Sequence, residues 1–343
     1  MHEQNDVPLS GLTTLRLGGP ARRLLVAGTE DEVVAVVREA DAAGEPLLVL
    51  GGGSNLVVAD EGFDGTVLRI AAGGAAGTAL TEHALEVAAG VDWDLAVALA
   101  VAEGYVGIEA LSGIPGLVGA APIQNIGAYG QDAAQTLAWV RALDRTTGEV
   151  VRLDNAACRF SYRHSVFKGS DRHVVLAVAF SLGRSRLGRP VRYAELARHL
   201  GVAVGDRVPG ADVRAAVLDL RRRKGMVLDA ADHDTWSAGS FFTNPVLATE
   251  EAQRLLPAEA PRWGEPGGRV KTSAAWLIER SGFGRGHGDG PARISTKHTL
   301  ALTNRGGAST AELIALAREV RDGVRTRFDI ELVNEPVLVG CTL

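Results

Sequence analysis

The sequence lacks the features that mark several common classes of protein. Its two cysteines, Cys158 and Cys341, lie in apolar surroundings without the spacing of a metal site, so we expect structural thiols and neither a disulfide nor a bound metal. Lys and Arg number 36 against 41 Asp and Glu, a net charge of -5, which leaves no basic surface for nucleic acid or anionic lipid. Neither a signal peptide in MHEQNDVPLS nor a transmembrane helix is evident. We expect a globular, cytoplasmic protein without nucleic-acid or membrane partners.

Familiar catalytic and nucleotide-binding motifs are also missing. The run GGGSN at 51–55 is followed by Leu56 where a dinucleotide fingerprint needs a third glycine, and no GK[ST] follows to make a P-loop. Neither Ser54 nor Ser240 stands in G-x-S-x-G, and H-E-x-x-H does not occur. What remains is a glycine triplet after the apolar run 46–50. Such a triplet can cradle a phosphate because no Cβ blocks the main-chain amides, although an ordinary tight turn fits equally well.

The sequence SGIPGLVGAAPIQNIGAYG, residues 112–130, forms a long neutral segment, since no charged residue occurs between Glu109 and Asp132. Pro115, Pro122 and five glycines disfavour a membrane helix and predict a buried, irregular backbone. The polar groups of such a backbone need partners, which a large polar ligand can supply. Together with the glycine triplet, the segment suits a long ligand with a diphosphate at one end and a flat ring system at the other.

The hydrophobic patterns predict alternating helices and strands without internal repeats. A capping box at Thr29–Glu32 predicts a helix ending near Gly44, and Thr272 is expected to cap another that stops near Gly282. The remaining elements are strands at 46–50, 66–70, 85–89, 173–182, 298–303 and 329–333, a hairpin at 137–153, and helices at 93–103, 193–200, 211–223 and 309–328.

Seven segments, in their order and spacing, resemble the UDP-N-acetylenolpyruvoylglucosamine reductases, flavoenzymes that make UDP-N-acetylmuramate for bacterial peptidoglycan. The segments are PARRLLVA, GGGSNLVVAD, SGIPGLVGAAPIQNIGAYGQD, CRFSYRHSVFK, SAGSFFTNPV, KTSAAWLIERSGF and NEPVLVG, which span nearly the whole chain. The resemblance implies an α+β protein: a two-subdomain FAD-binding fold of the vanillyl-alcohol-oxidase type, then a C-terminal α/β substrate-binding domain. We expect FAD-binding subdomains at 1–70 and 71–224, the second possibly joined by the tail 336–343, and a substrate domain at 225–335.

The resemblance also implies FAD as cofactor and NADPH as co-substrate. Wider relatives often attach the flavin to a histidine of the glycine loop, but this loop has none and the nearest one downstream is His83, so we expect non-covalent FAD. The implied diphosphate contacts are Gly51, Gly52, Gly53, Ser54 and Asn55, and the implied ring and ribityl contacts are Ser112, Gly113, Ile114, Pro115, Gly116, Gly119, Asn125, Gly127 and Ala128. One departure is Thr13-Thr14, where the family usually has Asn-Thr, which places a peripheral FAD contact in doubt.

Three catalytic residues follow from the same resemblance. Arg163 would bind the substrate carboxylate, Ser240 would donate a proton, and Glu335 would polarise the carboxylate. The residues alone favour a surface arginine for Arg163 and a turn cap beside Gly239 for Ser240, and they leave open a solvated carboxylate at a strand end for Glu335.

The resemblance implies weaker assignments for substrate binding. Tyr193 and Lys224 match substrate-diphosphate contacts and Asn244 a sugar contact, whereas Tyr193 could instead pack within its helix and Lys224 belong to a solvated helix end. Lys297 and His298 fall where a polar residue on the substrate side varies among relatives.

The leading hypothesis is NADPH-dependent reduction of UDP-N-acetylglucosamine enolpyruvate, in which NADPH and the nucleotide-sugar substrate use one pocket in turn. A different FAD oxidoreductase, such as a sugar oxidase, should carry the flavin-attaching histidine that is missing here. A nucleotide-sugar binding module without catalysis should have lost Arg163, Ser240 or Glu335, and all three are present. We expect a monomer or a weak dimer.

Overall fold

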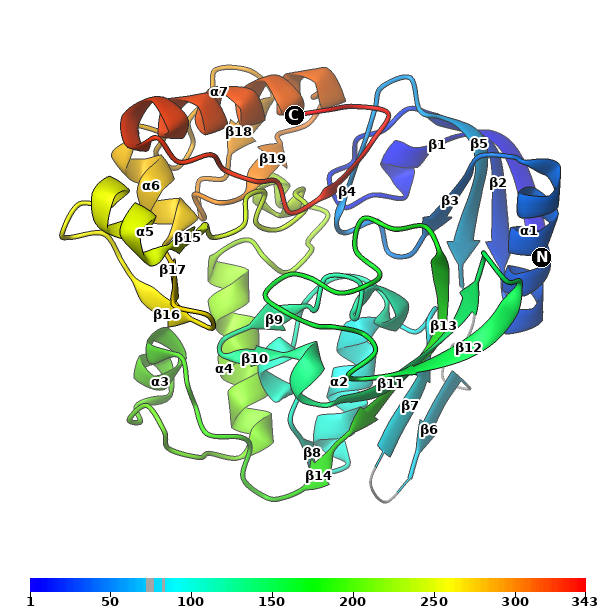
Figure 1. Ribbon diagram of the computed structural model, residues 1–343, viewed down its shortest axis with the longest axis horizontal. Coiled ribbons are helices and arrows are strands. Elements are labelled where there is room, and N and C mark those ends of the chain that lie inside the picture. Colours follow the sequence, from blue (N-terminus) through cyan, green and yellow to red (C-terminus); the bar gives the residue numbers. More distant parts are fainter. Residues whose placement is uncertain (72–76, 82–83) are drawn as a thin grey trace. The chain divides into compact units, whose positions relative to one another are not determined.

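The computed structural model describes residues 1–71, 77–81 and 84–343, and the chain forms two compact units within them. Both units are built from segments that lie far apart in the sequence (Figure 1). The first comprises residues 1–7, 21–53 and 64–227, and the second comprises residues 8–20, 54–63 and 228–343. In the described part of the chain, every helix is too short or too polar to cross a membrane.

A four-stranded sheet opens the first unit, in the order β1 (His2–Pro8), β2 (Pro20–Ala27), β5 (Phe63–Ile70), β3 (Leu47–Leu50). Helix α1 (Glu30–Ala43) lies along this sheet (Figure 1). The predicted capping box is present at its start, where Thr29 accepts from the amide of Glu32, and Gly44 ends the helix at φ 63°. Strand β3 runs parallel to β5 and ends at Leu50, so the glycine triplet follows directly at its carboxyl end.

A five-stranded antiparallel sheet forms the larger part of the first unit. Its strand order is β12 (Glu149–Asp154), β11 (Leu137–Asp144), β13 (His173–Ser181), β7 (Ala84–Ala88), β6 (Thr78–Leu80). The hairpin predicted at 137–153 is therefore confirmed, with Asp144 opposite Glu149. The other elements of this unit are α2 (Trp93–Ala102), α3 (Ala194–Leu200), α4 (Gly210–Arg223), β8 (Tyr105–Val106) paired with β14 (Gly183–Arg184), and β9 (Gly127–Ala128) paired with β10 (Gln131–Asp132).

The second unit combines short strands with three helices. Strand β4 (Leu56–Val58) pairs in parallel with the C-terminal β20 (Val337–Val339). Helix α7 (Thr310–Phe328), which begins at a capping box of Ser309 and Glu312, packs on α6 (Ala274–Arg280), β18 (Ala292–Ile294) and β19 (Leu302–Asn304). The remaining elements are α5 (Thr249–Leu255) and the sheet β15 (Val246–Ala248), β17 (Arg269–Lys271), β16 (Trp263–Glu265).

The strand predicted at 329–333 is wrong. Ile330 and Leu332 are buried while Val333 is 62% exposed, so the alternation that suggested a strand comes from packing on the core. No strand in the described part of the chain pairs with this stretch; one isolated bridge, Phe242 to Asn334, precedes strand β20.

Two other predicted elements need smaller corrections. The strand expected at 298–303 begins only at Leu302, because the amide of Ala301 donates to the carbonyl oxygen of His298 and closes a turn. Helix α6 is capped by Ser273, whose hydroxyl accepts from the amide of Trp276, whereas the buried Thr272 donates to the carbonyl oxygen of Pro261.

Candidate functional site

The glycine triplet and the neutral segment meet inside the first unit. A Cβ placed on Gly52 would lie 2.8 Å from the Cα of Gly116, and one on Gly51 would lie 3.7 Å from Leu117. Gly53 and Gly116 have φ values of +60° and +123°, which favour glycine. Two backbones approach this closely only because neither carries a side chain at the contact.

Main-chain amides on both sides of this contact are left for a ligand. Within the described residues, the amides of Gly52, Gly53, Ile114 and Gly116 donate no hydrogen bond to the protein. Gly52, Ile114 and Gly116 are only half-buried, so a ligand can reach them. Unused donors beside small neutral residues are the arrangement expected for a diphosphate and a planar ring. The first unit therefore fits FAD.

Ser54 and Asn55 belong to the second unit, where they follow the triplet into β4. The side-chain amide of Asn55 donates to the backbone carbonyl oxygen of Glu335 at 3.3 Å. The backbone carbonyl oxygen of Asn55 accepts from the amide of Val337 at 2.9 Å. Asn55 thus holds the backbone of a residue with a predicted catalytic role.

Other predicted cofactor contacts have strong structural roles of their own. Gly119 is buried so tightly that a Cβ would come within 2.6 Å of Ala89. The buried side chain of Asn125 accepts from the amide of Ala134 at 2.9 Å and donates to the carbonyl oxygen of Ser161 at 3.1 Å. Ser112 is buried and its hydroxyl donates to the carbonyl oxygen of Glu109. Pro115 is half-buried, as are Gly127 and Ala128, which form β9.

Arg163 lies against the neutral segment. Its Nη2 donates to the carbonyl oxygen of Gly127 at 2.8 Å, and its Nη1 to that of Asn125 at 3.4 Å. The residue is half-buried and has φ 52°, an uncommon conformation for a non-glycine residue. These contacts argue against the reading of Arg163 as an ordinary surface arginine.

Tyr193 and Lys224 belong to one aromatic and charged cluster in the first unit. The rings of Tyr129 and Tyr193 meet edge to face with centroids 5.6 Å apart, and the Lys224 ammonium lies 5.7 Å from the centre of the Tyr129 ring. Lys224 also pairs with Glu195 at 2.6 Å. Burial raises the pKa of Tyr129 to about 12, so this phenol is neutral at physiological pH.

The sequence prediction missed Tyr129, although it stands in the neutral segment as NIGAYG. The four neighbouring residues in the sequence are apolar or glycine, and they do not indicate that Lys224 and the ring of Tyr193 contact Tyr129. Tyr193 stands immediately before the first residue of α3 and is 46% exposed, so its ring is accessible to a ligand.

The second unit brings Ser240 and Glu335 together on adjoining extended segments. The amide of Glu335 donates to the carbonyl oxygen of Phe241 at 2.8 Å, and Thr243 donates in the same way to Val333 at 3.0 Å. Phe241 and Phe242 are fully buried beside the half-buried Ser240, which fixes the segment that carries the hydroxyl. Gly239, at φ +73°, supplies the turn before it.

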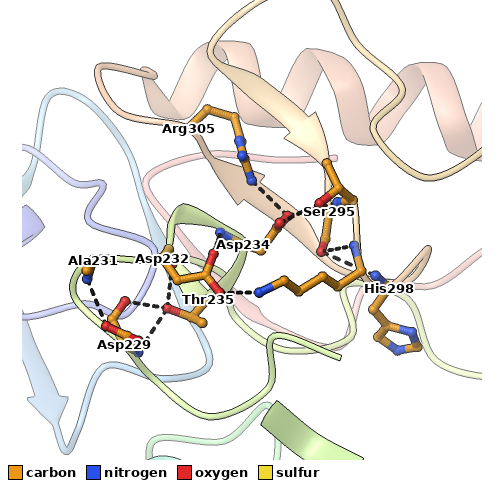
Figure 2. Close-up of polar contacts among 10 residues, drawn as sticks. Asp229, Ala231, Asp232, Asp234, Thr235, Ser295, His298 and Arg305 are labelled. Atoms are coloured by element: carbon orange, nitrogen blue, oxygen red, sulfur yellow. Dashed lines mark hydrogen bonds and ion pairs between the residues drawn. The ribbon is translucent and has the colours of Figure 1, made fainter. Parts of the chain in front are cut away.

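Asn244 follows Ser240 by four residues, and His298 stands two residues before Leu300, whose carbonyl oxygen accepts from the amide of Phe241 at 2.7 Å. Both have structural contacts. The side-chain oxygen of Asn244 accepts from the amide of Ala274 at 3.0 Å and so holds the start of α6. The hydroxyl of Ser295 accepts from the amides of Lys297 and His298, and Lys297 forms an ion pair with Asp232. Figure 2 shows the His298 ring directed away from this network.

Asp234 is the centre of the network in Figure 2. Its carboxylate accepts from the amide of Thr296 at 2.8 Å, from the Thr296 hydroxyl at 2.5 Å and from Arg305 at 2.7 Å. Because the carboxylate is buried and has three donors, it fixes the turn that precedes His298. Among the described residues, His, Cys, Asp and Glu form no group of three suited to a metal ion.

Comparison with known proteins identifies the class and then the family. A model described as an FAD binding domain matches residues 21–154, and the model of the C-terminal domain of UDP-N-acetylenolpyruvoylglucosamine reductase matches residues 231–339. The chain is an FAD-binding oxidoreductase, and the predicted fold class is confirmed. His83, which bore on the expected mode of flavin attachment, lies outside the described residues.

Relatives that match the whole chain carry the same name as the C-terminal domain model. UDP-N-acetylenolpyruvoylglucosamine reductase of Thermobifida fusca is 59% identical over 98% of this chain and 98% of its own, and that of Streptomyces coelicolor is 58% identical over 100% and 92%. The crystal structure of the Thermus caldophilus enzyme matches with a TM-score of 0.69 at 26% identity over 99% of both chains. The chain belongs to the UDP-N-acetylenolpyruvoylglucosamine reductase family, which confirms the resemblance predicted from its motifs.

Proposed function

We propose that the protein reduces UDP-N-acetylglucosamine enolpyruvate to UDP-N-acetylmuramate with NADPH, as a step of peptidoglycan precursor synthesis. The observation that carries the proposal is the contact of Gly52 with Gly116, in a chain whose full-length relatives bear this enzyme's name. Non-covalently bound FAD would supply the redox chemistry, accepting hydride from NADPH and returning hydride to the enolpyruvyl group. We further propose that the protein acts in the cytoplasm as a monomer or weak dimer.

The residues proposed to hold FAD divide into two sets. The amides of the glycine loop bind the diphosphate, since Gly52 and Gly53 have donors to spare. Main chain of the neutral segment borders the ring and ribityl chain, where a fixed charge would alter the redox balance of the ring. The proposed diphosphate contacts are Gly51, Gly52, Gly53, Ser54 and Asn55. The proposed ring and ribityl contacts are Ser112, Gly113, Ile114, Pro115, Gly116, Gly119, Asn125, Gly127 and Ala128.

Three residues are proposed to act on the substrate during reduction. Negative charge builds on the substrate carboxylate as an enolate forms, and the planar guanidinium of Arg163 stabilises it. Ser240 then donates a proton to the carbon that bears the carboxylate. A serine hydroxyl is a weak acid, so it needs both the strongly basic enolate and neighbours that hold it in place. Glu335, on the segment beside Ser240, polarises the carboxylate.

The nucleotide-sugar diphosphate and sugar are proposed to bind Tyr193, Lys224 and Asn244. The exposed Tyr193 ring and the Lys224 ammonium support this role, because Lys224 could exchange its half-buried partner Glu195 for a phosphate. We propose that residues 1–70 and 71–224 form the two FAD-binding subdomains and that residues 225–335 form the substrate domain. The tail 336–343 either joins the second subdomain or stands outside it.

The visible spectrum and the two half-reactions of the purified protein test the proposal. We expect yellow protein whose flavin is released by acid, is bleached by anaerobic NADPH and regains its colour when the enolpyruvyl substrate is added. A colourless protein that takes up no FAD would refute the proposal. Recovery with oxygen and a sugar, but not with the enolpyruvyl substrate, would indicate the alternative oxidase.

A further inference from the structure

The first turn of α2 holds the neutral segment at several points, all within the first unit. Two hydrogen bonds join them directly: the amide of Gly113 donates to Asp94 Oδ1 at 2.6 Å, and the amide of Trp93 donates to the carbonyl oxygen of Gly116 at 3.0 Å. Two more involve flanking residues: Trp93 Nε1 donates to the carbonyl oxygen of Leu111, just before the segment, at 2.9 Å, and the amide of Val118 donates to the carbonyl oxygen of Val91, just before the helix, at 2.9 Å. A short stretch of irregular backbone is thus fixed to a regular helix on both sides of Ile114 and Pro115.

Asp94 is the one charged acceptor among these contacts. Besides the amide of Gly113, its carboxylate accepts two hydrogen bonds from the guanidinium of Arg214 in α4, at 2.5 and 2.8 Å. Arg221 lies about two helical turns further along α4. Its Nε donates to the carbonyl oxygen of Gly113 at 3.1 Å. Charged side chains therefore hold both polar groups of Gly113.

The ionised state of Asp94 suits this role. Burial alone would raise its pKa, but the hydrogen bonds from Arg214 and from the amide of Gly113 outweigh burial and hold the pKa below its ordinary value. Asp94 is consequently an anion at neutral pH, and hydrogen bonds to an anion are stronger and shorter than neutral ones.

The position of Gly113 does not suit a residue with a side chain. Its φ is +72°, and a Cβ at this position would lie 2.8 Å from Leu218. A glycine restrains its own backbone less than any other residue, so the direction of the following amides depends on outside contacts. Those amides belong to Ile114 and Gly116, whose donors no described residue uses.

We infer that Asp94, held by Arg214, is a positioning residue for the flavin: it fixes the amides of Ile114 and Gly116 in the direction that the cofactor requires. This inference rests on the proposed function, because the neutral segment borders the ring only if the protein binds FAD there. Asp94 touches no cofactor or substrate in this role and acts through the backbone of Gly113.

The competing interpretation is an ordinary ion pair that stabilises the fold, and the chain provides a matched control for it. The Asp144 carboxylate is also held by an arginine, since Arg172 Nε lies 3.1 and 3.2 Å from its two oxygens and Arg172 Nη2 lies 2.6 Å from Oδ2, and it accepts from one backbone amide, that of Thr146, at 3.0 Å. This second pair lies at the turn of the β11–β12 hairpin, and among the described residues its carboxylate accepts hydrogen bonds only from Arg172 and Thr146. Replacing each aspartate by asparagine removes the same kind of charge from two different places.

The experiment measures FAD affinity and thermal stability in parallel. Wild-type protein, Asp94→Asn, Arg214→Lys and Asp144→Asn are stripped of flavin and titrated with FAD, with flavin fluorescence as the signal. We expect Asp94→Asn to bind FAD about 10- to 100-fold more weakly, the range expected when a charge-assisted hydrogen bond is lost. Arg214→Lys keeps the charge but loses the bidentate geometry, so its loss should be smaller. Asp144→Asn should stay within about twofold of the wild type even if its melting temperature falls.

The flavin absorption bands give a second readout, because they respond to hydrogen bonds at the ring and not to stability. They should shift in Asp94→Asn saturated with FAD and be unchanged in Asp144→Asn. Equal FAD affinities in these two variants would overturn the inference while leaving the proposed function intact. If Asp94→Asn does not fold, the FAD affinity of Arg214→Lys is compared with that of Asp144→Asn instead, and equal affinities would again overturn the inference. Failure of the wild type itself to bind FAD would instead overturn the proposed function, and this inference with it.

Discussion

The guanidinium of Arg163 donates a hydrogen bond to the carbonyl oxygen of Gly127 at 2.8 Å. The arginine proposed to bind the substrate carboxylate is thereby tied to the neutral segment proposed to border the flavin. Its backbone has φ 52°, and such a conformation persists in a folded protein only where surrounding contacts impose it. One side chain can therefore affect both the cofactor wall and the substrate charge.

Arg163→Lys should impair chemistry more than binding. Lysine keeps the positive charge but cannot bond to a carboxylate through two parallel N–H groups or reach the two carbonyl oxygens together. We expect reoxidation by the enolpyruvyl substrate to slow about 100-fold, the usual effect of losing one donor to a developing negative charge. Rapid-mixing kinetics at varied substrate concentration measure it. A raised KM with unchanged kcat would show Arg163 to be a simple binding group.

Gly52→Ala should prevent FAD binding and destabilise the protein. The added Cβ would lie 2.8 Å from a backbone atom of Gly116, which cannot rotate away as a side chain could. Overpacking of this kind typically costs about 1–3 kcal/mol. Gly183→Ala is a matched control, because a Cβ there has nothing within 4 Å. Urea unfolding and FAD titration of both variants check the prediction, and normal FAD binding by Gly52→Ala would contradict the glycine contact.

Signals confined to a few neighbouring residues predicted the local structure well. The capping box predicted at Thr29 was confirmed, and the helix predicted at 309–328 begins at a capping box of Ser309, because a cap and its partner lie only three residues apart. The glycine triplet and the neutral segment were recognisable because a backbone that approaches another backbone or a ligand needs small residues. These two elements are the main part of the candidate cofactor site.

Contacts between distant parts of the chain could not be predicted in this way. Asp94 looks like an ordinary acidic residue in the first turn of a helix, yet its partners are Gly113 and Arg214, which is 120 residues away. Likewise, Ile330 and Leu332 alternate as in a strand, but a strand also needs a partner for its backbone, and sequence alternation does not supply one. The surroundings of a residue, and so its role, depend on such contacts.

Asp234→Asn should destabilise the protein at neutral pH, and less so in acid. Burial alone would raise the pKa of Asp234, but hydrogen bonds from Thr296 and the charge of Arg305 outweigh it and hold the pKa below the ordinary value. The unfolded state therefore binds the proton more tightly than the folded state. The stabilisation from the carboxylate is complete above the ordinary aspartate pKa of about 4 and is lost as pH falls below it.

Removing one partner of a buried, hydrogen-bonded ion pair typically costs about 3 kcal/mol. We expect Asp234→Asn to lose about this much free energy of unfolding near pH 7, and the difference from the wild type to shrink progressively as the pH is lowered through about 4 towards 3. Urea unfolding across this range measures it, with Asp289→Asn as an exposed control in the same unit. A difference that stays constant with pH would show that the Asp234 carboxylate does not titrate with folding.

Ser240→Ala separates the two half-reactions most sharply. Only the reaction with the enolpyruvyl substrate needs a proton on carbon, whereas reduction of the flavin by NADPH does not involve this hydroxyl. Loss of a general acid typically slows a reaction by about 10²- to 10⁴-fold. We therefore expect reoxidation by substrate to slow by several orders of magnitude and reduction by NADPH to stay within about twofold of the wild type.

Ser237→Ala provides the control for a disturbed backbone. The hydroxyl of Ser237 accepts from the amide of Gly239 at 3.2 Å, so its removal loosens the turn before Ser240 without removing the proposed proton donor. Stopped-flow traces should show a small change in both half-reactions for Ser237→Ala and a large change in one for Ser240→Ala. Equal slowing of both half-reactions in Ser240→Ala would mean that the hydroxyl shapes the pocket and that the proton comes from elsewhere.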